Sequence, residues 1–201
     1  MRKTFTAIAA GLLLAATGAN ANLITNGTFD SPNLATGTFE PVPSLSFSDL
    51  NWGFYSGSSG LTKLVDNGGN QFAQIASGDF MYTSFTAATS GQYNISFDFQ
   101  GSGLWGLTGS SWSPTLVAPS YLANAGWASA SGGPVSLVGG DSYKIYFGGM
   151  VTPPQFSSTL SLDNVSVSAV TPVPEPEGYA MMLAGLGALG LMSRRRLRKD
   201  I

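Results

Sequence analysis

The sequence predicts an all-β fold, a two-sheet antiparallel sandwich of the jelly-roll type, between an apolar segment at each end of the chain. Short alternating runs bounded by Gly, Ser, Asn and Pro recur through the central part, where amphipathic helical spacing is missing. The 150 residues from 22 to 171 have the length of one domain with a core of its own. A solenoid is the structural alternative, but the sequence contains no internal repeat.

The clearest strands have large apolar residues at every second position, which places these side chains on one face of a sheet. Between Leu162 and Val165 the phase of this alternation changes, which predicts a β-bulge at Asp163 and Asn164. The alternating pattern predicts strands at residues 71–75, 80–85, 93–99, 143–147 and 159–167.

The segment from 101 to 140 carries no charge and is rich in Gly and Ser. We expect loops and one or two edge strands there, because tryptophans within such a segment favour packing or a binding surface over a plain linker. Prolines at 41–43 and 152–154 predict loops or edge positions, because proline donates no backbone hydrogen bond.

The first 21 residues have the pattern of a secretory signal peptide. Arg2 and Lys3 precede an apolar run from 5 to 17, and Ala19-Asn20-Ala21 follows the small-x-small cleavage rule. We therefore expect signal peptidase to cut after Ala21 and the mature chain to begin at Asn22.

The last 30 residues, 172–201, combine a proline-rich segment, an apolar helix and a basic tail. Val173-Pro174-Glu175-Pro176 cannot join the helix that follows, because proline disfavours helical geometry at itself and at the residue before it. The apolar stretch from 178 to 192 is shorter than the roughly 20 residues a bilayer core requires, but its interfacial residues extend it to a single transmembrane helix. The positive-inside rule places its basic end in the cytoplasm, on the evidence of Arg194, Arg195, Arg196 and Arg198.

This order of features resembles the PEP-CTERM sorting signal of bacterial exported proteins. The resemblance implies recognition of Pro174-Glu175-Pro176 by an exosortase-like membrane transpeptidase and cleavage nearby. The protein would then be anchored transiently in the inner membrane and afterwards sorted to the cell surface or the extracellular polysaccharide matrix. The alternative is a simple C-terminal membrane anchor.

Charge and composition of the body exclude several classes of function. Lys63 and Lys144 are its only basic residues against eight carboxylates, a formal charge of −6, which rules out a nucleic-acid partner. Without cysteine the chain forms no disulfide, and without histidine it lacks Ser/His/Asp and Cys/His catalysis and the usual zinc ligands. A glycoside hydrolase with two carboxylates is the remaining enzymatic alternative, with candidates Glu40, Asp49, Asp66, Asp79, Asp98 and Asp141, most of them in turn-like contexts. We expect no catalytic activity.

The two ends of the body have the sequences Asn22-Leu23-Ile24-Thr25-Asn26-Gly27-Thr28-Phe29-Asp30 and Ser161-Leu162-Asp163-Asn164-Val165-Ser166-Val167. They are similar to the first and last strands of galactose-binding-like jelly rolls, the fold of many carbohydrate-binding modules. The resemblance implies that Asp30 and Asp163 lie close together and hold a structural calcium ion, which prefers oxygen ligands. The alternative is that Asp30 caps a turn and Asp163 is a solvated bulge residue.

Aromatic residues in Gly/Ser-rich surroundings, Tyr55 among them, suggest a sugar-binding surface, and the candidates are Trp105, Trp112, Tyr121 and Trp127. The alternative is that these rings are ordinary core residues, which we favour for Trp52. The sequence therefore predicts an exported, non-catalytic body that binds polysaccharide, with a structural matrix or envelope protein without a defined sugar ligand as the second hypothesis.

Overall fold

The fold is described by a computed structural model that covers residues 21–55, 57, 61–150, 159–170 and 185–186. The chain divides into a body that ends at Val170 and a tail from Thr171 to Ile201. The body contains β1 (Phe39–Pro41), a 3-10 helix η1 (Val42–Ser44), α1 (Phe47–Leu50), β2 (Gly53–Tyr55), β3 (Lys63–Asn67), β4 (Asn70–Ala76), β5 (Phe80–Thr86), β6 (Gly91–Gly109), β7 (Thr115–Leu137), β8 (Ser142–Gly149) and β9 (Thr159–Ala169).

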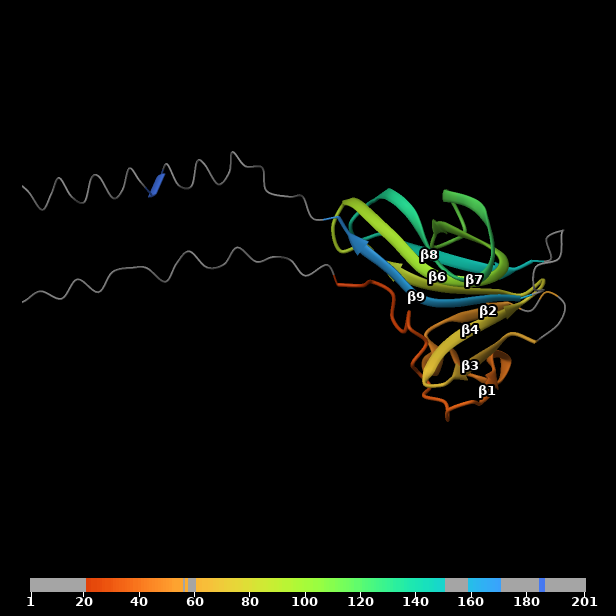
Figure 1. Ribbon diagram of the computed structural model, residues 1–201. Helices are drawn as coiled ribbons and strands as arrows, with labels where there is room; N and C mark the ends of the chain where they lie inside the picture. The colour runs from red at the N-terminus through yellow and green to blue at the C-terminus, as the bar shows by residue number, and fades with distance from the viewer. Residues whose placement is uncertain (1–20, 56, 58–60, 151–158, 171–184, 187–201) are drawn as a thin grey trace, which may run out of the picture. The chain divides into compact units, whose positions relative to one another are not determined.

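All neighbouring strands are antiparallel and follow the order β1-β3-β4-β9-β6-β8-β5-β2, with β7 paired to β6. The all-β prediction is confirmed, but the two predicted sheets are joined through β6. The first part of β6 pairs with β9 up to Gly101, and the second part pairs with β8 from Gly103 onward (Figure 1). Gly101 has a φ of +95°, and a Cβ there would collide with the backbone of Thr159, so this change of partner requires glycine.

The core lies between the two sets of strands that meet at β6. The alternate positions predicted to share one face of β6 are buried, and Phe97 at their centre contacts Phe147 of β8 with ring centroids 4.9 Å apart. Trp52 is also buried against Phe147, as expected, at 6.1 Å. Apolar side chains from both sets of strands therefore form one continuous core.

The predicted strands are all present, each extended by one or more residues at one or both ends, whereas the middle of the chain differs from the expectation. Residues 101–109 continue β6, and residues 115–137 form the long strand β7 in place of loops. Within the described residues β7 pairs with β6 only, so the edge-strand part of the prediction is confirmed. Small Gly, Ala and Ser side chains carry little alternation, and it is hydrogen bonding along β6 that makes this segment a strand.

The start of the body lies against its last strand. Leu23 N–H donates to the Val167 carbonyl at 2.8 Å, and Val165 N–H donates to the Gly27 carbonyl at 2.9 Å. The Asn22 side chain accepts from the backbone N–H groups of Ile24 and Val167 and donates to the Val165 carbonyl, each at 3.0 Å. These contacts fix the first residues of the body on β9.

The predicted bulge on β9 is confirmed. Ser166 pairs with Ser96 and Asp163 pairs with Asp98, so β9 has one residue more than β6 between these two pairs. Asn164 lies in this interval with a φ of +52°, a conformation that asparagine tolerates better than most residues.

Both predicted processing segments lie mainly outside the described residues. The signal peptide is described only at Ala21, and within the helix predicted at 178–192 only Gly185 and Leu186 are described, both helical. Within the described ranges, no helix is both long and apolar enough to span a membrane.

Candidate functional site: an aromatic cleft

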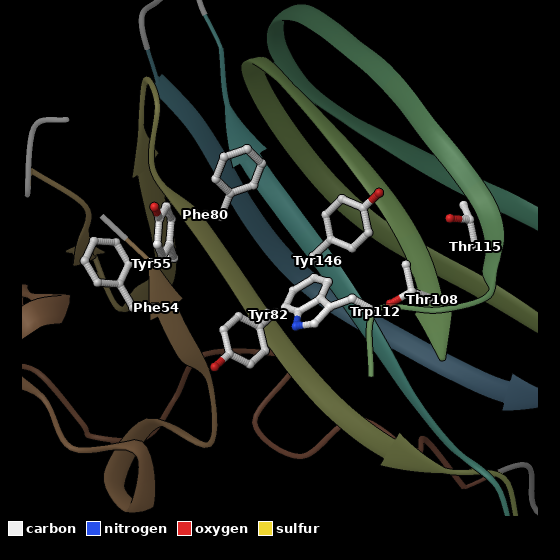
Figure 2. A pocket seen from close by; sticks show the side chains of 8 residues that line it. All are labelled: Phe54, Tyr55, Phe80, Tyr82, Thr108, Trp112, Thr115 and Tyr146. Atoms are coloured by element: carbon white, nitrogen blue, oxygen red, sulfur yellow. The ribbon is translucent and has the colours of Figure 1, made fainter. Parts of the chain in front are cut away.

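A cleft of about 560 Å³ lies over the strands β2, β5 and β8 and the end of β6. Figure 2 shows aromatic rings from separate elements around it, with two threonines at one end. Its lining consists of Phe54, Tyr55, Phe80, Tyr82, Thr108, Trp112, Thr115 and Tyr146.

The rings of the cleft come from the outward face of the strands, because side chains alternate between the two faces. On β5, Phe80 and Tyr82 alternate with the buried Met81 and Thr83. On β8, Tyr146 lies between the buried Ile145 and Phe147. Both faces of these strands therefore carry large residues. One face packs into the core, and the other lines the cleft.

Each of three rings lies on a glycine of the neighbouring strand. Gly53 pairs with Tyr82, and Gly106 pairs with Tyr146. A Cβ at either glycine would collide with the paired ring, and the same holds for Gly148 beneath Phe80. Because the glycines have no side chain, these rings can lie against the sheet.

Trp112 lies in the turn between β6 and β7 and adds an indole to the cleft. Its backbone N–H donates to the Gly109 carbonyl at 3.0 Å, and its φ is +65°. Its ring contacts Tyr82 edge-on at a centroid distance of 5.3 Å and lies 5.8 Å from Tyr146 at a tilt. The turn thus places an aromatic ring, 49% exposed, beside the two strand tyrosines.

The cleft has the chemistry of a binding site for a ligand with apolar faces and hydrogen-bonding groups. Burial raises the pKa of Tyr146 above its ordinary value of 10.0, so this phenol stays protonated at neutral pH and can donate a hydrogen bond. Among the described residues that line the cleft there is no carboxylate. Rings that offer apolar faces together with hydroxyl groups can bind a ligand that has both.

Trp112 is the one candidate aromatic residue that the structure places in the cleft. Trp105 is a core residue: its ring is 5% exposed and packs against Phe97 at 5.2 Å, so the expected surface role is wrong for it. Trp127, 44% exposed, contacts Phe72 of β4 edge-on at 5.3 Å and is not part of the cleft. Tyr121 on β7 is 73% exposed and also lies outside it.

Most of the remaining aromatic residues of the cleft were missed in the sequence, although two of the predicted strands contain several of them. Tyr82 and Tyr146 lie on the faces opposite to the core pattern, so a strand with large residues on both faces was the available signal. Cross-strand pairing is what brings them beside β2 and Trp112. The other residues missed are Phe54 and Phe80, whereas Tyr55 was already among the aromatic residues in Gly/Ser-rich surroundings that suggested such a surface.

The predicted calcium ligands differ in exposure. Asp163 on β9 is buried and accepts hydrogen bonds from the Asn70 side chain at 3.2 Å and from the Asn164 N–H at 2.7 Å. Burial raises its pKa above 3.8, and the negative charges of Asp98 and Asp30 raise it further. Asp30 is exposed and accepts from the Thr28 hydroxyl at 2.7 Å. No group of three or more Asp, Glu, His or Cys with metal-site spacing occurs among the described residues.

The sorting residues Val173, Pro174, Glu175 and Pro176 and the basic residues Arg194, Arg195, Arg196 and Arg198 lie outside the described residues. Their roles stay predictions from the sequence pattern.

Solved structures similar to this chain include carbohydrate-binding modules. A structure described as CBM4 is 17% identical with a TM-score of 0.47 and covers 73% of this chain and 99% of its own. TmCBM61 in complex with β-1,4-galactotriose is 14% identical with a TM-score of 0.47, at 75% and 99% coverage. The CBM22-1 xylan-binding domain of Paenibacillus barcinonensis Xyn10C is 13% identical with a TM-score of 0.42, at 70% and 99% coverage. At these identities and TM-scores, the similarity does not show what the cleft binds, so its ligand is inferred from the residues that line it.

No curated protein matches the chain. Residues 172–196 match the PEP-CTERM protein-sorting motif, which indicates an exported protein and confirms the resemblance based on Val173 to Pro176 and the basic tail.

Proposed function

We propose that this protein is exported to the cell surface or extracellular matrix and that its body binds polysaccharide, without catalysis, through the aromatic cleft. The observation that carries the proposal is the group of Tyr82, Tyr146 and Trp112, which come from separate elements, with both tyrosine rings in contact with Trp112 at one open cleft. Pyranose rings have apolar faces and a hydroxyl rim, which match aromatic faces and phenol groups.

The cleft favours binding over hydrolysis. Glycoside hydrolysis requires two carboxyl groups about 5 to 10 Å apart across the scissile bond. The described residues that line the cleft supply none, and the chain contains no histidine to replace them. The hydrolase alternative therefore has no support at this site.

The proposal is tested by binding of the purified chain to a panel of soluble polysaccharides in affinity electrophoresis, followed by calorimetry. We expect Trp112→Ala to weaken binding at least about tenfold, the scale of a central aromatic contact. Trp127→Ala is the matched control, because Trp127 has a similar exposure and a similar edge-on aromatic contact outside the cleft. Equal losses in both variants, or no binding to any polymer, would reject the cleft as the site.

The absence of sugar binding together with concentration-dependent self-association would favour the second hypothesis, a structural matrix or envelope protein. Analytical ultracentrifugation of the same samples separates the two, because a sugar-binding monomer keeps its sedimentation coefficient as its concentration rises.

For the route to the surface, we propose cleavage by signal peptidase after Ala21 and by an exosortase-like enzyme near Pro174 to Pro176, with membrane anchoring in between. Intact mass of the protein from membrane, surface and medium fractions tests this. We expect a species that begins at Asn22 and ends near the Pro-Glu-Pro motif. A membrane species that retains residues 194–201 would instead indicate a simple anchor.

We also propose that Asp30 and Asp163 bind calcium as a structural ion. The support is the buried carboxylate of Asp163. Burial raises its pKa, the negative charges of Asp98 and Asp30 raise it further, and no cationic side chain of the described residues offsets them. A divalent cation would offset this repulsion, and oxygen donors suit calcium.

A further inference from the structure

The body has two basic residues, and one of them lies at the aromatic cleft. Lys144 is on β8, two residues before Tyr146, so both side chains point to the same face of the sheet. It pairs across the strands with Ser84 of β5 and with Thr108 of β6, which lines the cleft. The Lys144 Nζ lies 4.9 Å from the ring centroid of Trp112 and 5.7 Å from that of Tyr82.

The ammonium group of Lys144 keeps its charge available. In the described part of the chain it makes no ion pair with a carboxylate and donates no hydrogen bond, and its contacts are with ring faces. Cation–π contact holds an ammonium group in place without neutralising it. A fixed positive charge beside a cleft without a carboxylate provides a site for an anion.

We propose that the cleft binds an acidic polysaccharide, and that the Lys144 ammonium pairs with a carboxylate of a uronic acid unit while the aromatic rings stack on the sugar. This inference rests on the proposed function and adds the charge of the ligand. A body with a formal charge of −6 repels a polyanion elsewhere, so Lys144 fixes where an acidic unit can approach.

The Lys144 ammonium would make a partly exposed, charge-assisted contact with the carboxylate of the ligand. A contact of that strength is enough to change the affinity about tenfold. Salt screens such a contact, whereas ring stacking depends little on salt. A ligand bound by both should therefore lose part of its affinity at high ionic strength and keep the rest.

The test compares polygalacturonate with fully methyl-esterified polygalacturonate, two polymers with the same sugar backbone and different charge. Calorimetry on the purified chain should give about tenfold tighter binding to polygalacturonate at low salt and nearly equal affinities at 300 mM salt, an ionic strength at which charged contacts are screened. Lys144→Met should remove the preference, so that its affinities for the two polymers become nearly equal at low salt, and Lys144→Arg should keep the preference.

Lys63→Met is the matched control. Lys63 is the other basic residue of the body and also lies over a ring, that of Phe39 at 4.5 Å, but it is on β3 and does not line the cleft. The inference predicts that Lys63→Met keeps the full preference. An equal loss in both variants would indicate a general charge effect and overturn it.

The outcomes separate this inference from the proposed function. Equal affinity of the unmodified protein for both polymers overturns the acidic ligand and leaves polysaccharide binding in place. A preference for a sulfated polymer over polygalacturonate that depends on Lys144 would overturn the inference that Lys144 pairs with a carboxylate. Absence of binding to any polymer overturns both proposals.

Discussion

Asp163 is a buried carboxylate whose environment favours its protonated form. Burial is the main cause of its raised pKa, and the charges of Asp98 and Asp30 add to it, while hydrogen bonds from Asn164 and Asn70 oppose it. A raised pKa in the folded state means that the folded chain holds a proton at pH values where the unfolded chain has released it. Ionisation of Asp163 therefore costs stability.

This predicts the pH dependence of stability in the absence of divalent cations. The stabilising effect of the protonated group is complete below the unfolded pKa of 3.8 and is lost as the pH rises through the raised pKa of folded Asp163. Asp163→Asn should lack this loss, so the stability difference between variant and parent should change as the pH is raised from below 3.8 to neutral. Urea unfolding in a chelator across that range measures it, and a constant difference would contradict the assignment.

Calcium gives a second prediction at the same residue. Bound calcium would neutralise the carboxylates, so calcium added at neutral pH should raise the melting temperature of the parent chain. Asp163→Asn should remove most of that increase, whereas Asp141→Asn, at an exposed turn, should keep it. Thermal unfolding of the parent and both variants, with calcium, with magnesium and with a chelator, measures this effect. Equal responses of the two variants would exclude the site.

At the scale of elements, the cleft depends on glycines that let aromatic rings lie on the neighbouring strand. Gly106→Ala should displace the Tyr146 ring, because the atoms that a Cβ would meet are at the far end of that side chain. We expect a stability loss of about 1 kcal/mol, the low end for overpacking, and a larger relative loss of polysaccharide affinity. Gly133→Ala on β7, where a Cβ meets nothing within 4 Å, is the control for both measurements. An unchanged affinity in Gly106→Ala would argue against a role for the ring position.

The strands with regular alternation were predictable from the sequence, and so was the bulge, because the change of phase before Val165 is visible without a structure. The length of β7 was not, since the mostly small side chains at 123–133, with Trp127 the one large exception, leave no pattern and the hydrogen bonds to β6 define the strand. The core position of Trp52 could be anticipated. For Trp105 the sequence fits a buried ring as well as an exposed one, and the contact with Phe97 that buries it follows only from the fold.

The cleft itself could be predicted only in part. Trp112 stood out because it lies in a Gly/Ser-rich turn, but Tyr82 and Tyr146 are in strands, where aromatic residues are normally read as core. Their place in one site depends on register, which pairs residue 53 with 82 and residue 106 with 146. Register follows from the whole set of strand pairs and is not encoded in any single segment.

At the scale of the whole molecule, the contact between the start of the body and β9 closes the fold. Asn22→Ala should lower the free energy of unfolding by about 1–3 kcal/mol, because it leaves the partly buried N–H of Val167 without its acceptor. Asn124→Ala is a suitable control, since among the described residues the side chain of Asn124 donates only to the nearby Gly126 carbonyl on the exposed strand β7. Urea unfolding of the mature chain measures both, and similar small effects would show that the contact contributes little.

The contact at Asn22 joins residues that are 143 and 145 positions apart in the chain. In the proposed route, a chain exported from its N-terminus would bring Asn22 out early and β9 almost last, so this pairing could not form until nearly all of the body had crossed the membrane. Folds that depend on such distant pairs form slowly, because loop closure precedes any gain from the contacts. In the export route proposed above, the late partner of Asn22 would therefore delay completion of the fold until transport is nearly complete.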